Sequence, residues 1–125
     1  MNLLLDTHVF IWVVDDDPKL SAAAWSIIEE ADAAFVSSAS IWEATIKYQL
    51  GKLKVDPDRL IDAVAQSGFR ELPITLRHAA AVARLPAIHR DPFDRVLLAQ
   101  AISEPLHFLT ADGKLSQYSE LVRQI

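Results

Sequence analysis

The chain has 125 residues, the size of one domain, and we expect residues 1–125 to form a single unit. Hydrophobic residues make up 51% of it and charged residues 23%, a globular composition that excludes disordered, collagen-like and long coiled-coil chains. Because the sequence contains no cysteine, it also excludes a disulfide framework, thiolate metal ligands and a cysteine nucleophile.

The sequence predicts a soluble, cytoplasmic protein. No apolar run approaches the roughly 20 residues of a membrane-spanning helix, and the first six residues lack the basic segment of a secretory signal. Seventeen acids against 12 bases give a formal net charge of −5, which argues against a general electrostatic binder of nucleic acid. If the protein acts on nucleic acid, we expect local basic patches, or metal ions that offset its acids, to make the contact.

Short strands and helices are expected to alternate through the first half of the chain. The strand signals are apolar runs, and the helix signals are apolar periodicity with a capping residue at the start. The expected elements are a strand over 3–5, a helix over 8–14, a helix capped by Ser21 and ending at Glu30, a strand over 33–36, and a helix from Ile41 to about Leu50 that Gly51 stops.

The alternation continues in the second half and sets the predicted fold class. The expected elements are a helix over 57–66, an edge strand over 71–74, a helix capped by Thr75 and ending near Leu85, a loop over 84–92, a helix opened by Asp91 and ending at Ile102, and strands over 107–110 and 121–125. This order predicts an α/β fold, a three-layer α/β/α sandwich with a mainly parallel central sheet.

Four carboxylates stand where strands end or the following helices begin. Asp6 and Asp112 follow strands, and Glu43 and Asp94 are expected in the first turns of helices. Ligands of a parallel sheet bind outside the carboxyl ends of its strands. We therefore expect Asp6, Glu43 and Asp112 at one edge, joined by Asp94 if its helix begins on the same side.

Each acid taken singly also has a purely structural interpretation. Short polar side chains cap helices and form turns without any role in chemistry. The alternatives are a capping box of Ser40 and Glu43, an N-cap at Asp91 with Asp94 in the first helical turn, a cap at Asp6, and a turn at Asp112-Gly113.

Taken together, the four acids predict a hard metal ion. All of them adjoin strongly apolar sequence, so we expect them to be half-buried and close together. Carboxylates in such a cleft repel one another and raise each other's pKa, and a divalent cation relieves this. With oxygen ligands and no cysteine, Mg²⁺ or Mn²⁺ is preferred. Such an ion activates water and binds a phosphate oxygen, which points to phosphodiester hydrolysis.

Four blocks of the sequence resemble the PIN-domain ribonucleases, and more closely the VapC-type toxins of bacterial toxin–antitoxin pairs. They are residues 3–12 (LLLDTHVFIW), 38–43 (SASIWE), 91–101 (DPFDRVLLAQA) and 108–112 (FLTAD). Each block is short, but together they occur in order over nearly the whole chain.

This resemblance implies a PIN-like endoribonuclease that depends on Mg²⁺ or Mn²⁺, cleaves RNA, forms a homodimer and is held inactive by a cognate antitoxin. By position, it implies that Asp6, Glu43, Asp94 and Asp112 are the catalytic acids. Asp6 and Asp94 would bind the metal directly, Asp112 would complete the metal site directly or through water, and Glu43 would orient the attacking water or a second metal.

Neighbouring residues receive supporting roles. The hydroxyls of Thr7 and Thr110 are expected to fix the carboxylates, Asp91 is assigned to capping, and His8 is expected to be structural. A rim of bases is expected to grip phosphates, although each could instead pair with an acid: Lys47, Lys52, Lys54, Arg84, His89, Arg90 and Arg95. The sequence does not decide whether the large apolar residues belong to the core, to a dimer interface or to an antitoxin groove. These residues are Phe10, Trp12, Val13, Trp25 and Trp42.

Two other function classes compete with the nuclease. A phosphatase of the haloacid-dehalogenase type would use Asp6 as nucleophile, but it requires a second Asp two residues later, where this chain has His8. A catalytically inactive PIN-like module that binds RNA or protein would not need all four acids, and clustered carboxylates without a metal would destabilise its fold.

Overall fold

A five-stranded parallel sheet forms the centre of the molecule. The computed structural model describes residues 1–87 and 90–125. The sheet order within these residues is β3-β2-β1-β4-β5, and every pairing is parallel. The strands are β1 (Asn2–Leu5), β2 (Ala33–Ser37), β3 (Arg70–Leu72), β4 (His107–Thr110) and β5 (Val122–Gln124).

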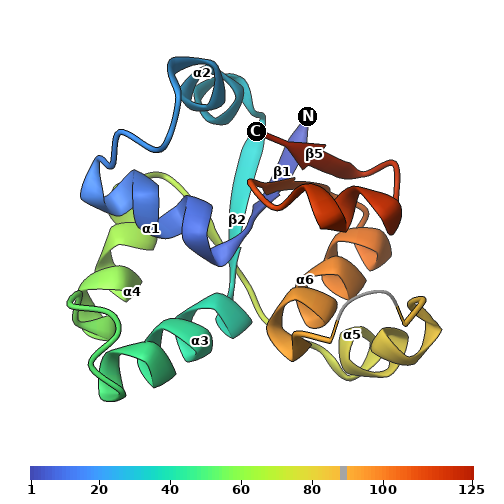
Figure 1. The fold of residues 1–125 in the computed structure, drawn as a ribbon. Coiled ribbons are helices and arrows are strands. Elements are labelled where there is room, and N and C mark those ends of the chain that lie inside the picture. The colour runs from blue at the N-terminus through green and yellow to red at the C-terminus, as the bar shows by residue number, and fades with distance from the viewer. Residues whose placement is uncertain (88–89) are drawn as a thin grey trace.

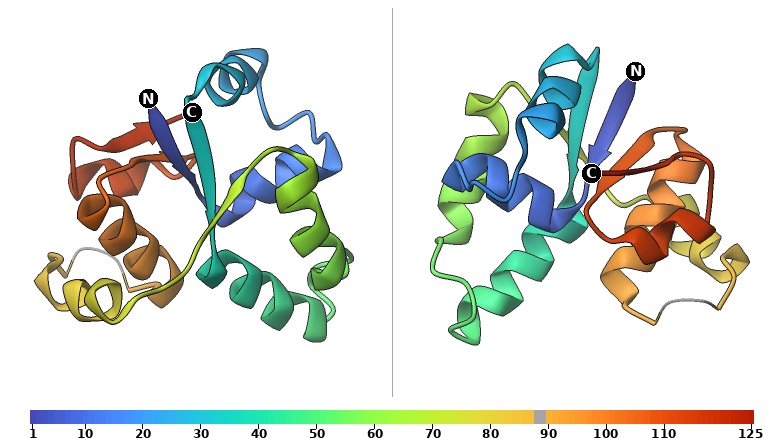
Figure 2. Two further views of the ribbon diagram at one scale, coloured as in Figure 1. Left: turned by 180° about the vertical axis from the view of Figure 1, so that it is seen from behind. Right: turned by 45° about the horizontal axis from the view of Figure 1, so that its top comes forward.

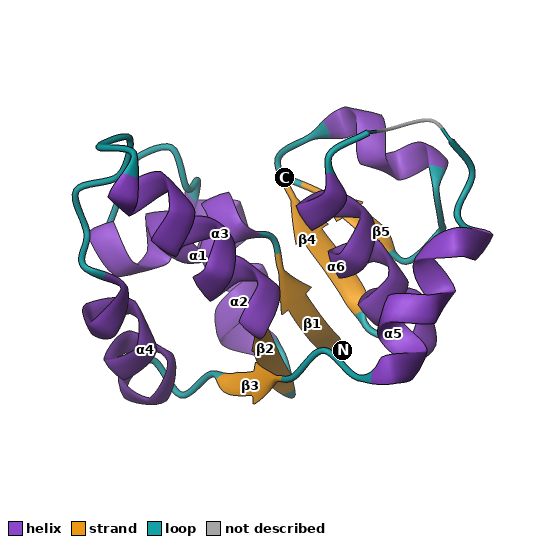
Figure 3. Ribbon diagram, turned by 90° about the horizontal axis from the view of Figure 1, so that it is seen from below, coloured by secondary structure: helices purple, strands orange, loops and turns teal. Residues whose placement is uncertain are grey.

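Helices cover both faces of this sheet and confirm the predicted three-layer α/β/α fold (Figures 1 and 3). Seen from behind, β1 and β2 lie side by side between α4 and α6 (Figure 2). The helices are α1 (Thr7–Asp15), α2 (Ala22–Glu30), α3 (Ser38–Gln49), α4 (Pro57–Gln66), α5 (Leu76–Ala81) and α6 (Pro92–Ser103), with short 3₁₀ helices η1 (Val82–Arg84) and η2 (Gly113–Gln117).

The run of leucines in β1 packs into both layers. Leu3 and Leu5 belong to the core cluster that contains Phe10 of α1, and Leu4 belongs to the cluster that contains Leu97 of α6. Successive side chains of a strand point to opposite faces, so a strand buried on both faces reads as a continuous apolar run. This places the end of β1 in the middle of the molecule.

The start of α3 differs from the prediction. The helix begins at Ser38, and its N-cap is Ser37, whose hydroxyl accepts a 3.0 Å hydrogen bond from the Ala39 N–H. The predicted start at Ile41 was therefore wrong, since Ser37 already caps the helix three residues earlier. Glu43 consequently lies in the second helical turn rather than the first, and the predicted capping box of Ser40 and Glu43 does not form.

Several other boundaries follow their sequence signals. Ser21, Thr75 and Asp91 cap α2, α5 and α6 as predicted. The edge strand β3 ends at Leu72, before the Pro that was expected inside it, because proline has no N–H to donate to a ladder. The predicted turn at Asp112 is the N-cap of η2, whose Lys114 N–H donates to the Asp112 carboxylate. Within residues 1–87 and 90–125, no helix combines the length and apolar character needed to cross a bilayer.

The strand order creates a switch point between β1 and β4. After β1 the chain builds β2 and β3 on one side, and it then returns to place β4 and β5 on the other. Leu5 pairs with Leu109, and the Asp6 N–H donates to the Leu109 carbonyl at 2.9 Å. Ligands of open parallel sheets bind at such a point, outside the carboxyl ends of the strands.

Candidate active site

Asp6 occupies the switch point with a fully engaged carboxylate. It follows β1 directly and is the N-cap of α1. Its Oδ1 accepts a 2.7 Å hydrogen bond from the Thr7 N–H, and its Oδ2 accepts one of 2.7 Å from the Thr110 hydroxyl at the end of β4. With 5% of its surface exposed, Asp6 is a buried acid fixed by donors from two strand ends.

Burial raises the pKa of the Asp6 carboxyl above its ordinary value, and the negative charge of Glu43 adds to this increase. Hydrogen bonds from Thr110 and Thr7 and the neighbouring imidazole of His8 oppose it without cancelling it. A carboxylate held in a site of low dielectric constant is destabilised unless a cation compensates its charge. An acid perturbed in this way at the ligand-binding edge of a sheet is a candidate functional residue.

Thr110 connects two of the predicted catalytic acids. Its hydroxyl donates to Asp6 and accepts a 3.0 Å hydrogen bond from the Asp112 N–H. This confirms the expectation that Thr110 fixes a carboxylate. The same expectation for the Thr7 hydroxyl was wrong, because that hydroxyl donates to Ser40 Oγ at 2.9 Å and the Thr7 backbone N–H holds Asp6 instead.

Replacing Thr110 by Val should weaken both the site and the fold. The substitution keeps the side-chain shape but leaves Asp6 Oδ2 and the Asp112 N–H without their shared partner. Loss of such a buried hydrogen bond costs about 1–3 kcal/mol of folding free energy, and loss of a group that orients a site carboxylate costs about 10–100-fold in activity. Thermal unfolding and RNA cleavage would measure the two effects.

Thr110→Ser is the matched control, because it retains the hydroxyl. It should keep cleavage within a few fold of the wild type. A Val variant as active as the Ser variant would show that the hydroxyl plays no part in positioning Asp6.

Glu43 is paired with a lysine one helical turn away. The Lys47 ammonium lies 2.9 Å from Glu43 Oε2, and Glu43 is buried, with a relative exposure of 6%. The structure therefore contains the ion pair that was one of the two roles considered for Lys47. Because Glu43 also raises the pKa of Asp6, the ammonium offsets part of the repulsion between the two acids.

The two acids of the Asp-Pro-Phe-Asp block occupy different positions at the N-terminus of α6. Asp91 Oδ1 accepts hydrogen bonds from the backbone N–H groups of Phe93 and Asp94, at 2.9 and 3.4 Å. The assignment of Asp91 to capping is confirmed. Asp94 follows in the first turn of α6 and is half-buried. Arg95 donates to the carbonyls of Val82 and Pro86, at 3.1 and 2.9 Å. These hydrogen bonds connect η1 and Pro86 to α6.

The structure links the four predicted acids to different degrees. Asp6 and Asp112 share Thr110, and Asp6 and Glu43 interact electrostatically. Asp94 is on α6, which packs beside α3, since the rings of Trp42 and Phe93 touch across the two helices. Among the residues that the structure describes, no three His, Asp or Glu side chains are grouped so that they could hold one metal ion as they stand.

The donor chemistry nevertheless fits a hard divalent cation. The candidate ligands Asp6, Asp94 and Asp112 offer carboxylate oxygens, the ligands that Mg²⁺ and Mn²⁺ prefer. Asp6 is a buried acid whose charge the hydrogen bonds around it do not fully compensate. A bound cation would supply that missing compensation at the switch point.

Sequence reasoning missed two residues of this region. Ser40 is buried and accepts the hydrogen bond of the Thr7 hydroxyl, a contact between distant segments that no local sequence pattern indicates. Ser37, which follows the predicted strand over 33–36, caps α3, and it thereby sets the position of Glu43. His89, which was expected in the basic rim, lies outside the described residues.

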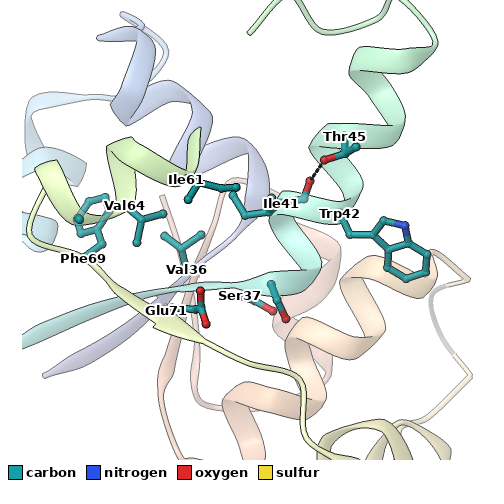
Figure 4. Close-up of a pocket in the computed structure, with 11 residues that line it drawn as sticks. Val36, Ser37, Ile41, Trp42, Thr45, Ile61, Val64, Phe69 and Glu71 are labelled. Atoms are coloured by element: carbon teal, nitrogen blue, oxygen red, sulfur yellow. Dashed lines mark hydrogen bonds between the residues drawn. The ribbon is translucent and has the colours of Figure 1, made fainter. Parts of the chain in front are cut away.

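The large apolar side chains divide clearly between core and surface. Phe10 is buried, Trp12 and Trp25 pack against the same core, and Trp42 is 61% exposed. An apolar hollow of about 540 Å³ lies between α3 and α4. Figure 4 shows Ile41 and Ile61 pointing toward one another there. Trp42 also lines this hollow, and its ring extends toward α6, where it contacts Phe93.

The fold and the acids at its switch point define a class of protein. Residues 3–121 match the PIN domain family, and the chain belongs to this family. The resemblance drawn from the four sequence blocks is confirmed.

Individual proteins of similar sequence or fold give a more detailed comparison. The chain is 30% identical to Ribonuclease VapC22 of Mycobacterium tuberculosis over 120 residues, which are 94% of this chain and 92% of that protein. It also shares its fold with VapBC2 from Rickettsia felis, solved bound to a promoter DNA fragment, at 15% identity and a TM-score of 0.74 over 98% and 96% of the two chains. A toxin–antitoxin complex from Klebsiella pneumoniae matches at 19% identity and a TM-score of 0.67, over 98% and 99%.

Proposed function

We propose that this chain is a VapC-type endoribonuclease, the toxin of a bacterial toxin–antitoxin pair, and that it requires Mg²⁺ or Mn²⁺. The observation that carries the proposal is Asp6, a buried acid of raised pKa held between two strand ends at the switch point of the sheet. Membership of the PIN domain family and the similarity to Ribonuclease VapC22 support the same function.

Asp6, Glu43, Asp94 and Asp112 are the proposed catalytic acids. Asp6, Asp94 and Asp112 would hold the cation, which supplies a water of lowered pKa and a binding point for a phosphate oxygen. The hydroxyl of Thr110 and the N–H of Thr7 keep Asp6 in one orientation.

Glu43 would orient the attacking water and accept its proton. The ammonium of Lys47, 2.9 Å from Glu43 Oε2, holds the Glu43 carboxylate in place until substrate arrives. RNA, with its closely spaced phosphates, would then be bound at the acids by the cation and by the neighbouring bases.

The proposal includes a cognate antitoxin, a homodimer and a cytoplasmic location. Solved chains of the same fold come from VapBC and other toxin–antitoxin complexes, which supports an antitoxin partner. The competing function is an inactive PIN-like module that binds RNA or protein. The presence of all four acids favours the enzyme, because the buried carboxylate of Asp6 without a catalytic cation would only destabilise the fold.

Incubation of total cellular RNA with the purified protein tests this proposal. We expect discrete cleavage products with Mg²⁺ or Mn²⁺ and none with EDTA. EDTA removes the cation, which is the group that lowers the pKa of the attacking water. Sequencing of the product ends would locate the cut. The Asp94→Asn variant, run in parallel, should produce no products.

Two results would contradict the proposal. Absence of cleavage by folded wild-type protein with either ion would favour the binding module. Cleavage that persists in EDTA, or in the Asp94→Asn variant, would mean that the activity comes from a contaminant or from another site.

A further inference from the structure

Two consecutive positions of α3 carry an exposed aromatic ring and the proposed catalytic glutamate. Glu43 and Lys47 adjoin because they are four positions apart on the helix, and Trp42 directly precedes Glu43. Trp42 is 61% exposed, whereas Glu43 is buried. The Trp42 ring contacts Phe93 of α6 edge-on, with ring centroids 5.2 Å apart and an interplanar angle of 76°. The exposed ring is thus held in one orientation by a second ring.

A hollow of about 500 Å³ lies beside these rings, between α3 and the N-terminus of α6. Its volume falls within the range of sites for small ligands, about 300–1,000 Å³. Within the described part of the chain, its lining contains two acids, two cationic side chains and one aromatic residue, Phe93; Trp42 does not line it but contacts the Phe93 ring. The lining residues are Glu43, Ile46, Lys47, Arg90, Asp91, Pro92 and Phe93.

This combination matches the chemistry of an unpaired nucleotide. A nucleobase is flat and stacks on aromatic side chains, and its phosphate binds lysine and arginine. Because Glu43 lines the hollow, a nucleotide bound there lies next to the proposed site of cleavage. A duplex, whose bases are stacked on one another, could not use the rings in this way.

We propose that Trp42 and Phe93 stack one unpaired base of the RNA beside the scissile bond, while Lys47 and Arg90 contact its phosphate. The inference rests on the proposed ribonuclease function and adds a base-binding site to it. RNA rather than a protein surface is the expected occupant, because the hollow shares Glu43 with the proposed catalytic site and offers Lys47 and Arg90 to a phosphate.

A binding experiment on a synthetic RNA that spans the mapped cleavage site tests this inference. Asp94→Asn serves as the background, so that the RNA is bound but not cut, and fluorescence anisotropy of the labelled RNA gives the affinity. Since stacking contributes about 1–3 kcal/mol per base, Trp42→Ala should weaken binding by about 5–100-fold. Trp42→Phe should stay within about threefold, because it retains a ring.

Tyr48→Ala is the matched control. Tyr48 is also an exposed aromatic residue of α3, but the ring of α3 that contacts Phe93 at the hollow is that of Trp42, so removal of the Tyr48 ring should leave the affinity unchanged. Circular dichroism of each variant would establish that the fold is intact, which we expect because neither ring is buried.

Abasic substitution of the RNA identifies the stacked base. The bases flanking the cut are removed one at a time, and one removal should weaken binding to the protein that carries Trp42 but have little effect on Trp42→Ala. An equal loss in both proteins, or equal affinity of both for the intact RNA, would overturn the inference.

Two further outcomes distinguish a base-binding site from a contact between protein copies and from the absence of nuclease activity. If Trp42→Ala changes the sedimentation mass of the protein without RNA and leaves RNA affinity intact, the ring is an interface between copies and the inference is wrong. If the wild type cleaves no RNA at all, the proposed function itself has failed. Cleavage by the wild type with unaltered binding by Trp42→Ala would overturn the base site alone.

Discussion

Asp6→Asn should abolish RNA cleavage while making the metal-free protein more stable. The substitution keeps the side-chain size but removes the charge that would bind the cation, so we expect a loss of activity of about 10²–10³-fold or more. The Asn oxygen can still accept from the Thr7 N–H, and its amide can donate to the Thr110 hydroxyl. The fold therefore loses little hydrogen bonding and no longer buries a carboxylate.

The effect on stability depends on pH in a defined direction. Burial raises the pKa of Asp6 in the folded protein above its unfolded value, so the folded state binds the proton more tightly. The stability that Asp6 contributes is fully present below the unfolded pKa of about 4. It is lost as the pH rises through the folded pKa. At neutral pH the ionised Asp6 therefore destabilises the metal-free fold.

Thermal unfolding in EDTA, measured from about pH 4 to pH 7.5, would test this sign. The melting temperature of Asp6→Asn should exceed that of the wild type by a few degrees at neutral pH, and the difference should shrink toward pH 4. Adding Mn²⁺ should raise the melting temperature of the wild type more than that of the variant. A variant less stable than the wild type at neutral pH would mean that Asp6 has a structural role.

The pair Asp94→Asn and Asp91→Asn should separate catalysis from capping within one block of sequence. Asp91 caps α6, and Asn caps helices about as well as Asp, so Asp91→Asn should keep activity within about twofold. Asp94→Asn removes a proposed metal ligand and should reduce cleavage by about 10²-fold or more. The two substituted residues are three positions apart, and each substitution replaces a carboxylate by an amide of the same size.

Their stabilities make the comparison sharper. Loss of negative charge in the first turn of a helix costs about 0.3–1 kcal/mol through the helix dipole, and this cost applies to both variants. We expect similar melting temperatures and very different rates of RNA cleavage. Equal loss of activity in both would indicate that the charge of the α6 N-terminus, rather than Asp94 itself, supports the reaction.

Much of this protein was predictable from local sequence signals. The leucines of β1 form an apolar run because the strand is buried on both faces. Asp91 followed by Pro92 marks the start of α6, since each residue suits its position at a helix N-terminus. The order of strands and helices was sufficient for the α/β class, and the acids could be placed at strand ends because connections in such folds are regular.

Only the tertiary structure decided how these residues are used. The register of β1 against β4 brings the Thr110 hydroxyl to Asp6, across 104 positions of sequence, and no local pattern contains that distance. Ser37 rather than Ser40 caps α3, because the end of β2 determines where the following helix can begin. The exposure of Trp42, in contrast to the packed Trp12 and Trp25, likewise depends on which helices pack around it. Local chemistry sets which elements form, whereas their packing sets which side chains meet, because contacts between distant segments exist only in the folded chain.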